Sequence, residues 1–225
     1  YQESILSGMK IAYSGTVGAF AHIATEKLFP TAIKIPFPSF EDAYKSVESG
    51  ECDAVVLPLE NSYNGEVGQV TDLMFSGNLY VNAMLDLAVS QDLLAVKGAD
   101  KSQIKTVISH PQALGQCAEY IRKMGWTTEE YANTALAAKR VAECGDPCVA
   151  AIASADAAEV FGLDILERNI NESRTNTTRF AAFSRSERLQ EGARMGEHFI
   201  MVFTVKNEAG SPLCETAAPN AFFAF

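Results

Sequence analysis

Residues 176–180, with the sequence Asn-Thr-Thr-Arg-Phe, place the hydroxyl of Thr178 next to the guanidinium of Arg179, just before the apolar run 181–183. Such a run predicts a strand, and neighbouring side chains of a strand point to opposite faces. An arginine can clamp a carboxylate, while a hydroxyl can hydrogen bond a departing oxygen. An arginine beside a strand can equally pair with a surface carboxylate and contribute little. The triplet alone therefore leaves both interpretations open.

Three further junctions between predicted strands and loops carry polar side chains. Their residues are Asn61 and Ser62, then Ser109, His110 and Gln112, then Thr134. Amides, hydroxyls and backbone N–H groups just past a buried strand can hold an anion. Each also has a structural interpretation, because such residues cap helices or form turns, and a histidine before proline is more often a turn residue. These residues by themselves decide neither way.

Composition restricts the classes of function. The chain has 225 residues and a net charge of −10, which argues against a nucleic-acid surface. An anionic substrate must then be attracted by local donors. The apolar runs are too short to span a bilayer, so no membrane partner is expected, and no secretion signal is visible in the printed residues. The five scattered cysteines predict reduced thiols in a cytoplasmic protein.

Cofactor and metal signatures are missing from the sequence. Gly15 and Gly18 lack the third glycine of a dinucleotide fingerprint and the lysine of a phosphate loop. Cys144 and Cys148 have no histidine nearby to complete a zinc site. There is also no Gly-x-Ser-x-Gly elbow. We therefore expect no cofactor, no metal and no covalent nucleophile.

Strand-like and helix-like segments alternate along the chain. Predicted strands are 9–13, 33–36, 53–57, 79–89, 92–96, 104–108, 149–153 and 164–166, and predicted helices are 19–29, 39–50, 67–75, 111–124, 134–144 and 154–161. This alternation predicts an α/β fold with mainly parallel sheets. A break at 98–100 suggests two lobes. Ligands in such folds gather at the carboxyl ends of strands, so a cleft between lobes is the expected site.

Several separate motifs agree in order and spacing with those of one family. They are 12–15 with 18–20 and His22, 54–62 with Gly65, 109–113 with 116–117, 134–135, 162–163, 165–166 and 176–180. Together they resemble the catalytic domain of the prephenate dehydratase family over roughly residues 10–185. The resemblance implies a two-lobed fold like that of type II periplasmic binding proteins. One lobe would comprise 9–90 and 178–190, and the other 91–177.

The resemblance also implies an activity. The family converts prephenate to phenylpyruvate, water and carbon dioxide in phenylalanine synthesis, without a cofactor, and its members commonly form homodimers. Thr178 matches the family's catalytic threonine and Arg179 its substrate-binding arginine. The residues that fall on pocket motifs are Asn61, Ser62, Ser109, His110, Gln112, Thr134 and Phe180.

The chemistry suits these side chains. Losing carbon dioxide and hydroxide together makes the ring aromatic, so the barrier lies in expelling hydroxide. Thr178 would hydrogen bond the departing oxygen and relay a proton to it. Arg179 would most usefully hold the side-chain carboxylate, because a tight clamp on the departing carboxylate stabilises the ground state. The sequence leaves open which carboxylate Arg179 meets.

The chain departs from the family pattern in three places. Thr16, Val17 and Ala21 stand where relatives often carry other residues, which could weaken activity. Residues 1–8 look like the link that follows a chorismate mutase domain. Residues 196–225 resemble a truncated ACT regulatory domain with its first strand only, and one strand cannot form a domain. We therefore expect no feedback by phenylalanine.

Two other readings share the fold. A non-catalytic module that binds or senses a small acid could use the same arginine and Asn-Ser loop. It predicts saturable binding without turnover. A decayed dehydratase that survives as an assembly module predicts a folded dimer that makes no phenylpyruvate.

Overall fold

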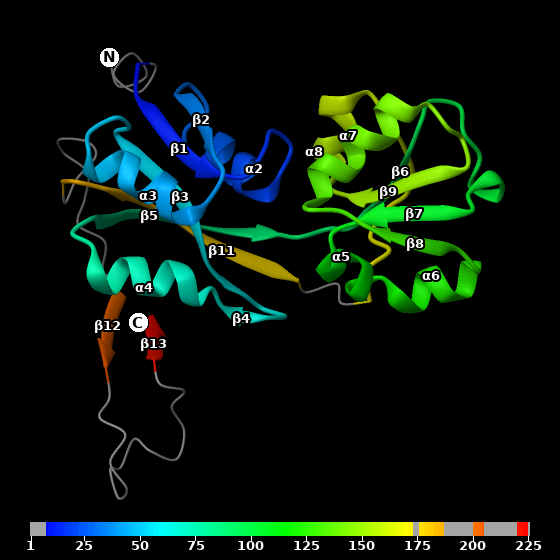
Figure 1. Cartoon of the computed structure of the whole chain (residues 1–225). Helices are drawn as coiled ribbons and strands as arrows, with labels where there is room; N and C mark the ends of the chain where they lie inside the picture. The colour runs from blue at the N-terminus through cyan, green and yellow to red at the C-terminus, as the bar shows by residue number, and fades with distance from the viewer. Residues whose placement is uncertain (1–7, 173–175, 187–199, 205–219, 225) are drawn as a thin grey trace, which may run out of the picture.

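The computed structural model describes residues 8–172 and 176–186, together with the backbone of 200–204 and 220–224. Two sheets stand side by side in it, each covered by helices (Figure 1). The first sheet has the order β2-β1-β3-β11-β5, with β4 paired to β3. Its strands are β1 (Lys10–Ser14), β2 (Ile33–Phe37), β3 (Ala54–Asn61), β4 (Gly65–Glu66), β5 (Tyr80–Ala88) and β11 (Thr177–Ser184).

Helices cover both faces of this first sheet. They are α2 (Phe20–Leu28), α3 (Phe40–Glu48) and α4 (Gly68–Ser76). One apolar cluster joins the sheet to α2 and contains Phe180 and Ala182. The other joins it to α3 and α4 and contains Ala181 and Phe183. We call these the α2 face and the α3/α4 face. Consecutive side chains of β11 therefore enter the two clusters in turn, so the strand is buried on both faces, as its apolar run predicts.

The second sheet has the order β10-β6-β9-β7-β8. Its strands are β6 (Asp92–Ala95), β7 (Thr106–Ser109), β8 (Thr127–Glu130), β9 (Val149–Ala153) and β10 (Asp164–Glu167). Its helices are the 3-10 turn η1 (Lys101–Gln103), α5 (Pro111–Gln116), α6 (Ala118–Met124), α7 (Thr134–Cys144) and α8 (Ala155–Phe161). One core cluster lies against α5 and α6, and the other against α7 and α8. The predicted single helix 111–124 is therefore two helices, separated at Cys117.

The α/β class is confirmed, but the prediction of mainly parallel sheets is wrong. Parallel pairing is confined to β1 with β2 and β3, and β7 with β8 and β9. The strands β11, β5, β4, β6 and β10 pair antiparallel. The reason lies in the connections. The chain leaves the first sheet along β5 and returns to it along β11, so the two strands run in opposite directions (Figure 1).

Two crossing segments, 89–91 and 168–176, connect the sheets, and hydrogen bonds join the first to the described residues of the second, 168–172 and 176. Val89 N–H donates to the carbonyl of Asn176 at 2.8 Å, and Ile170 N–H donates to that of Gln91 at 2.9 Å. Gln91 N–H in turn donates to Asn171 Oδ1 at 3.0 Å. The two crossing segments are therefore held together by hydrogen bonds and are not independent linkers.

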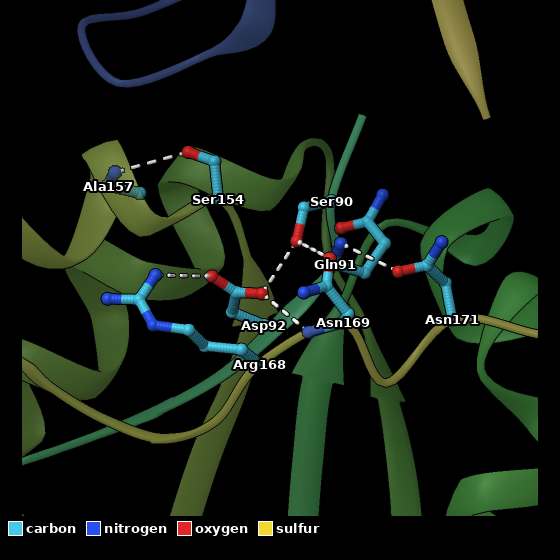
Figure 2. A network of polar contacts seen from close by, with 8 residues as sticks. All are labelled: Ser90, Gln91, Asp92, Ser154, Ala157, Arg168, Asn169 and Asn171. Atoms are coloured by element: carbon cyan, nitrogen blue, oxygen red, sulfur yellow. Dashed lines mark hydrogen bonds and ion pairs between the residues drawn. The ribbon is translucent and has the colours of Figure 1, made fainter. Parts of the chain in front are cut away.

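A buried carboxylate organises one side of the crossings (Figure 2). Asp92 Oδ1 accepts from the hydroxyl of Ser90 at 2.7 Å and from the backbone N–H of Asn169 at 2.8 Å. Arg168 Nη1 lies 3.7 Å from Asp92 Oδ2. Asn169 has a positive φ of 54°, which asparagine tolerates better than most residues. The carboxylate thus holds a turn of unusual backbone geometry in place.

Beyond residue 186 the structure describes two strands, β12 (Ile200–Thr204) and β13 (Asn220–Ala224), which pair antiparallel. In Figure 1, β12 lies next to α4. The expectation of a single strand in this part of the chain is therefore corrected to two. Among the described helices, none is both long and apolar enough to cross a bilayer.

Candidate active site

A β-bulge brings Asn61 opposite Thr178. The pairing of β3 with β11 slips by one residue at Leu59, which has no opposite residue. Beyond the slip, Asn61 pairs with Thr178. Bulges re-aim side chains and occur often next to active sites. Here the bulge directs the carboxamide of Asn61 to the hydroxyl of Thr178.

The hydroxyl of Thr178 accepts a hydrogen bond and keeps its own proton. Asn61 Nδ2 donates to Thr178 Oγ1 at 2.9 Å. An amide nitrogen cannot accept, so the Thr178 proton takes no part in this bond. It is the one hydrogen bond of that hydroxyl among the described residues, and the side chain is half-buried. The proton is therefore available to an outside acceptor.

Backbone groups determine which way the Asn61 carboxamide faces. Its Oδ1 accepts from the N–H groups of Tyr63 at 2.9 Å and Asn64 at 3.2 Å. With the oxygen held by two backbone donors, the NH₂ group must face Thr178. This is turn chemistry, as one interpretation of the sequence had it, but it also serves the hydroxyl.

Three more buried amides continue the contact toward the second sheet. Asn61 Nδ2 also donates to Asn176 Oδ1 at 2.8 Å. Asn176 Nδ2 donates to Gln116 Oε1 at 3.3 Å, and Gln91 Nε2 donates to the same oxygen at 3.3 Å. We call Gln91, Gln116, Asn176 and Asn61 the amide chain. It runs from the crossing through α5 to the hydroxyl of Thr178.

A pocket of about 300 Å³ adjoins the amide chain. Its described lining residues are Tyr63, Gln116, Asn171, Glu172 and Asn176. The oxygen of Gln116 is used twice within the chain, whereas no described residue accepts from its Nε2. Glu172 Oε1 accepts from the backbone N–H of Glu119 at 3.0 Å and so caps α6. The wall of the pocket is therefore mostly neutral, with amide groups for polar ligand atoms.

Arg179 forms a bidentate ion pair with Asp86 on β5. Its Nε lies 2.8 Å from Oδ1, and its Nη2 lies 3.1 Å from Oδ2. The hydrogen bonds from the guanidinium lower the pKa of Asp86, and the carboxylate raises the pKa of Arg179. Alternation along β11 directs Arg179 to the α3/α4 face and Thr178 to the α2 face. The two groups are neighbours in sequence with different surroundings.

Two predicted site residues lie in the interior instead. Ser109 is completely buried, and its hydroxyl donates to the carbonyl of Ile152 on β9 at 2.6 Å. Phe180 is also buried, in the apolar cluster of the α2 face. Both placements differ from the expected contact with substrate. The reason is the same for both: each side chain belongs to a strand that is covered on two faces.

The other predicted residues lie at loop and helix starts. Ser62 Oγ accepts from Thr177 N–H at 2.9 Å, which extends the β3–β11 ladder. His110 Nδ1 accepts from Gln112 N–H at 3.2 Å and caps α5. The side chain of Gln112 is exposed. Thr134 is the first residue of α7 and is half-buried.

The cap of α7 is Asn133, whose Oδ1 accepts from Leu136 N–H at 2.7 Å. Thr134 is therefore not the cap of α7, and its hydroxyl does not cap the helix.

Three members of the amide chain, Asn176, Gln116 and Gln91, were missed as site residues. The first two lie within the motifs at 176–180 and 109–117, which is the signal that could have found them. Gln91 carries no such signal.

The loop between β1 and α2 touches the second sheet's helices. Gly18 has a φ of +87°, and a Cβ there would lie 3.5–3.7 Å from Phe161, Ala157 and Ala135. In the same loop, Thr16 Oγ1 is buried without a partner among the described residues. His22 Nδ1 accepts from Gly18 N–H at 3.4 Å, and burial lowers the pKa of His22. The loop thus closes one side of the junction between the sheets.

Metal ligands do not gather in the described part of the chain. No group of three or more histidine, cysteine or acidic side chains that could hold an ion occurs there. Cys52, Cys117, Cys144 and Cys148 are free thiols. The arrangement as a whole offers neutral hydrogen-bond donors, one available hydroxyl proton and a paired guanidinium. Such groups can polarise an oxygen and hold an acid.

Known proteins are similar in sequence to this chain over most of its length. The family model described as prephenate dehydratase matches residues 11–188. The chain belongs to the prephenate dehydratase family. An Arabidopsis thaliana chloroplastic arogenate dehydratase/prephenate dehydratase is 37% identical over 81% of this chain and 49% of its own. A bifunctional chorismate mutase/prephenate dehydratase of Buchnera aphidicola is 31% identical over 89% of this chain and 53% of its own.

Solved structures agree on the fold. A prephenate dehydratase of Arthrobacter aurescens in complex with L-Phe has a TM-score of 0.78 at 25% identity, over 91% of this chain and 69% of that one. A protein described as the quorum quenching acylase GqqA has a TM-score of 0.76 at 30% identity, over 89% of this chain and 73% of that one. The chain spans about half the length of the curated relatives it matches.

Proposed function

We propose that this protein catalyses the decarboxylative dehydration of prephenate to phenylpyruvate, as a lyase of phenylalanine synthesis. The observation that carries the proposal is the state of the Thr178 hydroxyl. It occupies the position of the family's catalytic threonine, accepts from Asn61 at 2.9 Å and retains its own proton. The pocket of about 300 Å³ is lined by Asn176, two residues from Thr178, and its amides at Gln116, Asn171 and Asn176 can bind polar oxygens of a small acid.

Two bonds of the substrate break in the reaction. The ring–carboxylate bond breaks to release carbon dioxide, and its electron pair enters the ring as the ring–oxygen bond breaks. The departing oxygen receives the Thr178 proton and leaves as water, and solvent returns a proton to the threonine. The Asn61 N–H stabilises negative charge on Oγ1 during this transfer, which makes the hydroxyl a better donor. Aromatisation supplies the driving force.

For Arg179 we propose contact with a substrate carboxylate through the guanidinium hydrogens that Asp86 does not use. Because Arg179 and Thr178 point to opposite faces of β11, this contact requires the substrate to bind across the start of the strand, where both residues lie. Asp86 engages Nε and Nη2, which leaves Nη1. The ion pair would hold the guanidinium in one orientation, because both bonds of a bidentate pair must be kept. Ser62, His110, Gln112 and Thr134 are proposed to line the substrate region, since each lies at a loop or helix start.

Further proposals concern the whole protein. The two sheets support a division into lobes at 9–90 with 178–190 and at 91–177. Free thiols at the described cysteines support a cytoplasmic location. The family resemblance supports a homodimer, a chorismate mutase link at 1–8 and an ACT-like segment at 196–225; of these segments the structure describes only residue 8 and the backbone of 200–204 and 220–224. Each is a separate proposal that leaves the chemistry at Thr178 unaffected.

The test is direct product formation. Purified protein is incubated with prephenate, and phenylpyruvate is followed by its alkaline absorbance, with arogenate in parallel because several relatives carry that name. We expect phenylpyruvate to form in proportion to enzyme. Saturable prephenate binding without product would support the non-catalytic module instead. A folded protein that neither binds nor converts prephenate would support the decayed dehydratase. One of the similar solved structures is described as an acylase, which is a further reason to measure the product itself.

A further inference from the structure

We propose that Asn176 is a positioning residue for the reaction: it holds the carboxamide of Asn61 so that one N–H bonds Thr178, and it ties that arrangement to α5. The inference rests on the proposed function, because its consequence is a change in turnover. Asn176 is itself 4% exposed, so its hydrogen bonds form in the interior.

Asn176 contacts both Asn61 and α5 through its carboxamide. Its Oδ1 accepts from Asn61 at 2.8 Å, the shortest bond that the carboxamide of Asn61 makes. Its Nδ2 donates to Gln116 Oε1 at 3.3 Å. Its backbone carbonyl accepts from Val89 N–H in the other crossing at 2.8 Å. The residue is therefore fixed from three directions, and it passes that constraint to Asn61.

Without Asn176, the NH₂ group of Asn61 has a competing acceptor. The carbonyl of Thr177 lies 3.4 Å from Asn61 Nδ2, a long contact while Asn176 is present. An unpaired buried N–H is costly, so the carboxamide would rotate, within the hydrogen bonds that Tyr63 and Asn64 N–H make to its oxygen, to shorten that contact. Such a turn moves the second N–H away from Thr178 Oγ1. The hydroxyl would then lose the donor that stabilises its charge during proton transfer.

Asn176 also makes this arrangement depend on the second sheet. Gln116 is the last residue of α5, and its backbone carbonyl accepts from Glu172 N–H at 2.9 Å. The acceptor that orients Asn176 is therefore carried by a helix of the other sheet. The hydroxyl receives its partner in the correct orientation when α5 and the crossing are docked together. Turnover is thereby linked to the relative placement of the two sheets.

The first experiment compares Asn176→Ala, Asn61→Ala and the double variant in the phenylpyruvate assay. We expect Asn176→Ala to lower kcat by about tenfold to a hundredfold, the range of one lost hydrogen bond to a charged transition state, with KM within about threefold. The double variant should be no slower than Asn61→Ala, since Asn176 acts through Asn61. Asn82→Ala is the matched control, because Asn82 bonds Ser184 Oγ at 2.9 Å near the far end of β11.

A second variant separates positioning from a structural role. In Asn176→Asp, the neutral carboxyl reproduces both bonds: its C=O accepts from Asn61 and its O–H donates to Gln116. Once ionised, it places a negative charge near the departing hydroxide. We therefore expect kcat of this variant to be near that of wild type at low pH and to fall as pH rises through the pKa of the new carboxyl. Wild type should show no such step.

The outcomes are distinct. Wild-type kcat in Asn176→Ala, additive losses in the double variant, or a pH profile of Asn176→Asp identical to wild type would each overturn the positioning role. Wild-type protein that makes no phenylpyruvate would overturn the proposed function and this inference together. If Asn176→Ala melts below the assay temperature, the pH profile of Asn176→Asp decides the question.

Discussion

The two sides of the crossing between the sheets are built from different chemistry. On one side, the amide chain of neutral carboxamides leads from Gln91 to the hydroxyl of Thr178. On the other, a carboxylate gathers its neighbours: Asp92 accepts from Ser90 and Asn169 and lies near Arg168 (Figure 2). The consecutive residues Ser90 and Gln91 belong to one side each. One short segment thus serves both.

The difference separates two tasks. Carboxamides do not titrate, so the amide chain presents the same donors to Thr178 at every physiological pH. It can be tuned only through geometry. A buried carboxylate binds its donors more strongly but is costly to strip of them. We infer that the charged side stabilises the crossing and that the neutral side serves the reaction.

The largest expected effect on stability is at Asp92. Asp92→Ala removes the acceptor for the Ser90 hydroxyl and the Asn169 N–H, so we expect the free energy of unfolding to fall by about 2–4 kcal/mol. Urea unfolding followed by circular dichroism measures it. Asp92→Asn keeps one acceptor oxygen and should lose less. If both variants unfold like wild type but lose turnover, the tasks of the two sides are reversed.

Arg179→Lys should chiefly weaken substrate binding. An ammonium cannot reproduce the planar fork that Asp86 orients, so we expect KM for prephenate to rise about tenfold with a smaller change in kcat. Steady-state kinetics over a range of prephenate concentrations gives both constants. An unchanged KM would place Arg179 with Asp92 among the structural charges. Lys45→Arg, a charge-conserving change at an exposed position of α3, is the control.

The Arg179–Asp86 pair should show a small, pH-dependent contribution to stability. The pKa of Asp86 is lowered in the folded state, so its contribution is complete above the unfolded value near 3.8 and is lost as pH falls through the lower folded value. With the carboxylate 54% exposed, we expect under about 1 kcal/mol. Unfolding of wild type and Asp86→Asn should differ at pH 6 and converge only as pH falls below 3.8 and through the lowered pKa of Asp86. A gap that widens on acidification would contradict the sign.

Thiol labelling reports whether α5, the helix that carries Gln116, stays packed on the second sheet. Cys117 is completely buried, and burial raises the pKa of its thiol to about 12, whereas Cys144 is exposed. We expect a maleimide to modify Cys144 within minutes and Cys117 far more slowly, with the sites mapped by mass spectrometry. Labelling of Cys117 should accelerate in Asp92→Ala. Equal rates in native wild type would show that α5 opens freely.

Local features of this fold could be predicted from the sequence because they depend on nearby residues. The helix 134–144 was predicted with the bounds that it has, and Ser39, where the predicted helix 39–50 begins, is the cap of α3 and accepts from Asp42 N–H. The direction of β5 and β11 could not be predicted, because it depends on where the chain crosses between sheets. The break at Cys117 has one sequence signal, Gly115 in the last turn of α5, and an isolated glycine in a helical pattern does not by itself predict a break.

The candidate site follows the same division. Thr178 and Asn61 are found by motif, but their contact depends on a bulge at Leu59, for which the neighbouring Pro58 is the sequence signal, since a proline inside a strand is typical of an edge or a bulge. The partner of Arg179 is Asp86, which is 93 residues away in sequence. Ser109 and Phe180 were predicted in the pocket and lie in the core, because a motif identifies a residue and not the direction of its side chain.

The most direct test of the account compares Thr178→Val with Thr178→Ser at saturating prephenate. Valine keeps the shape of threonine and lacks the hydroxyl, whereas serine keeps the hydroxyl. We predict that kcat for phenylpyruvate falls by about a thousandfold or more in Thr178→Val and stays within about tenfold of wild type in Thr178→Ser, with melting temperatures unchanged. Wild-type turnover in Thr178→Val would contradict the account, because no proton from residue 178 would then be needed.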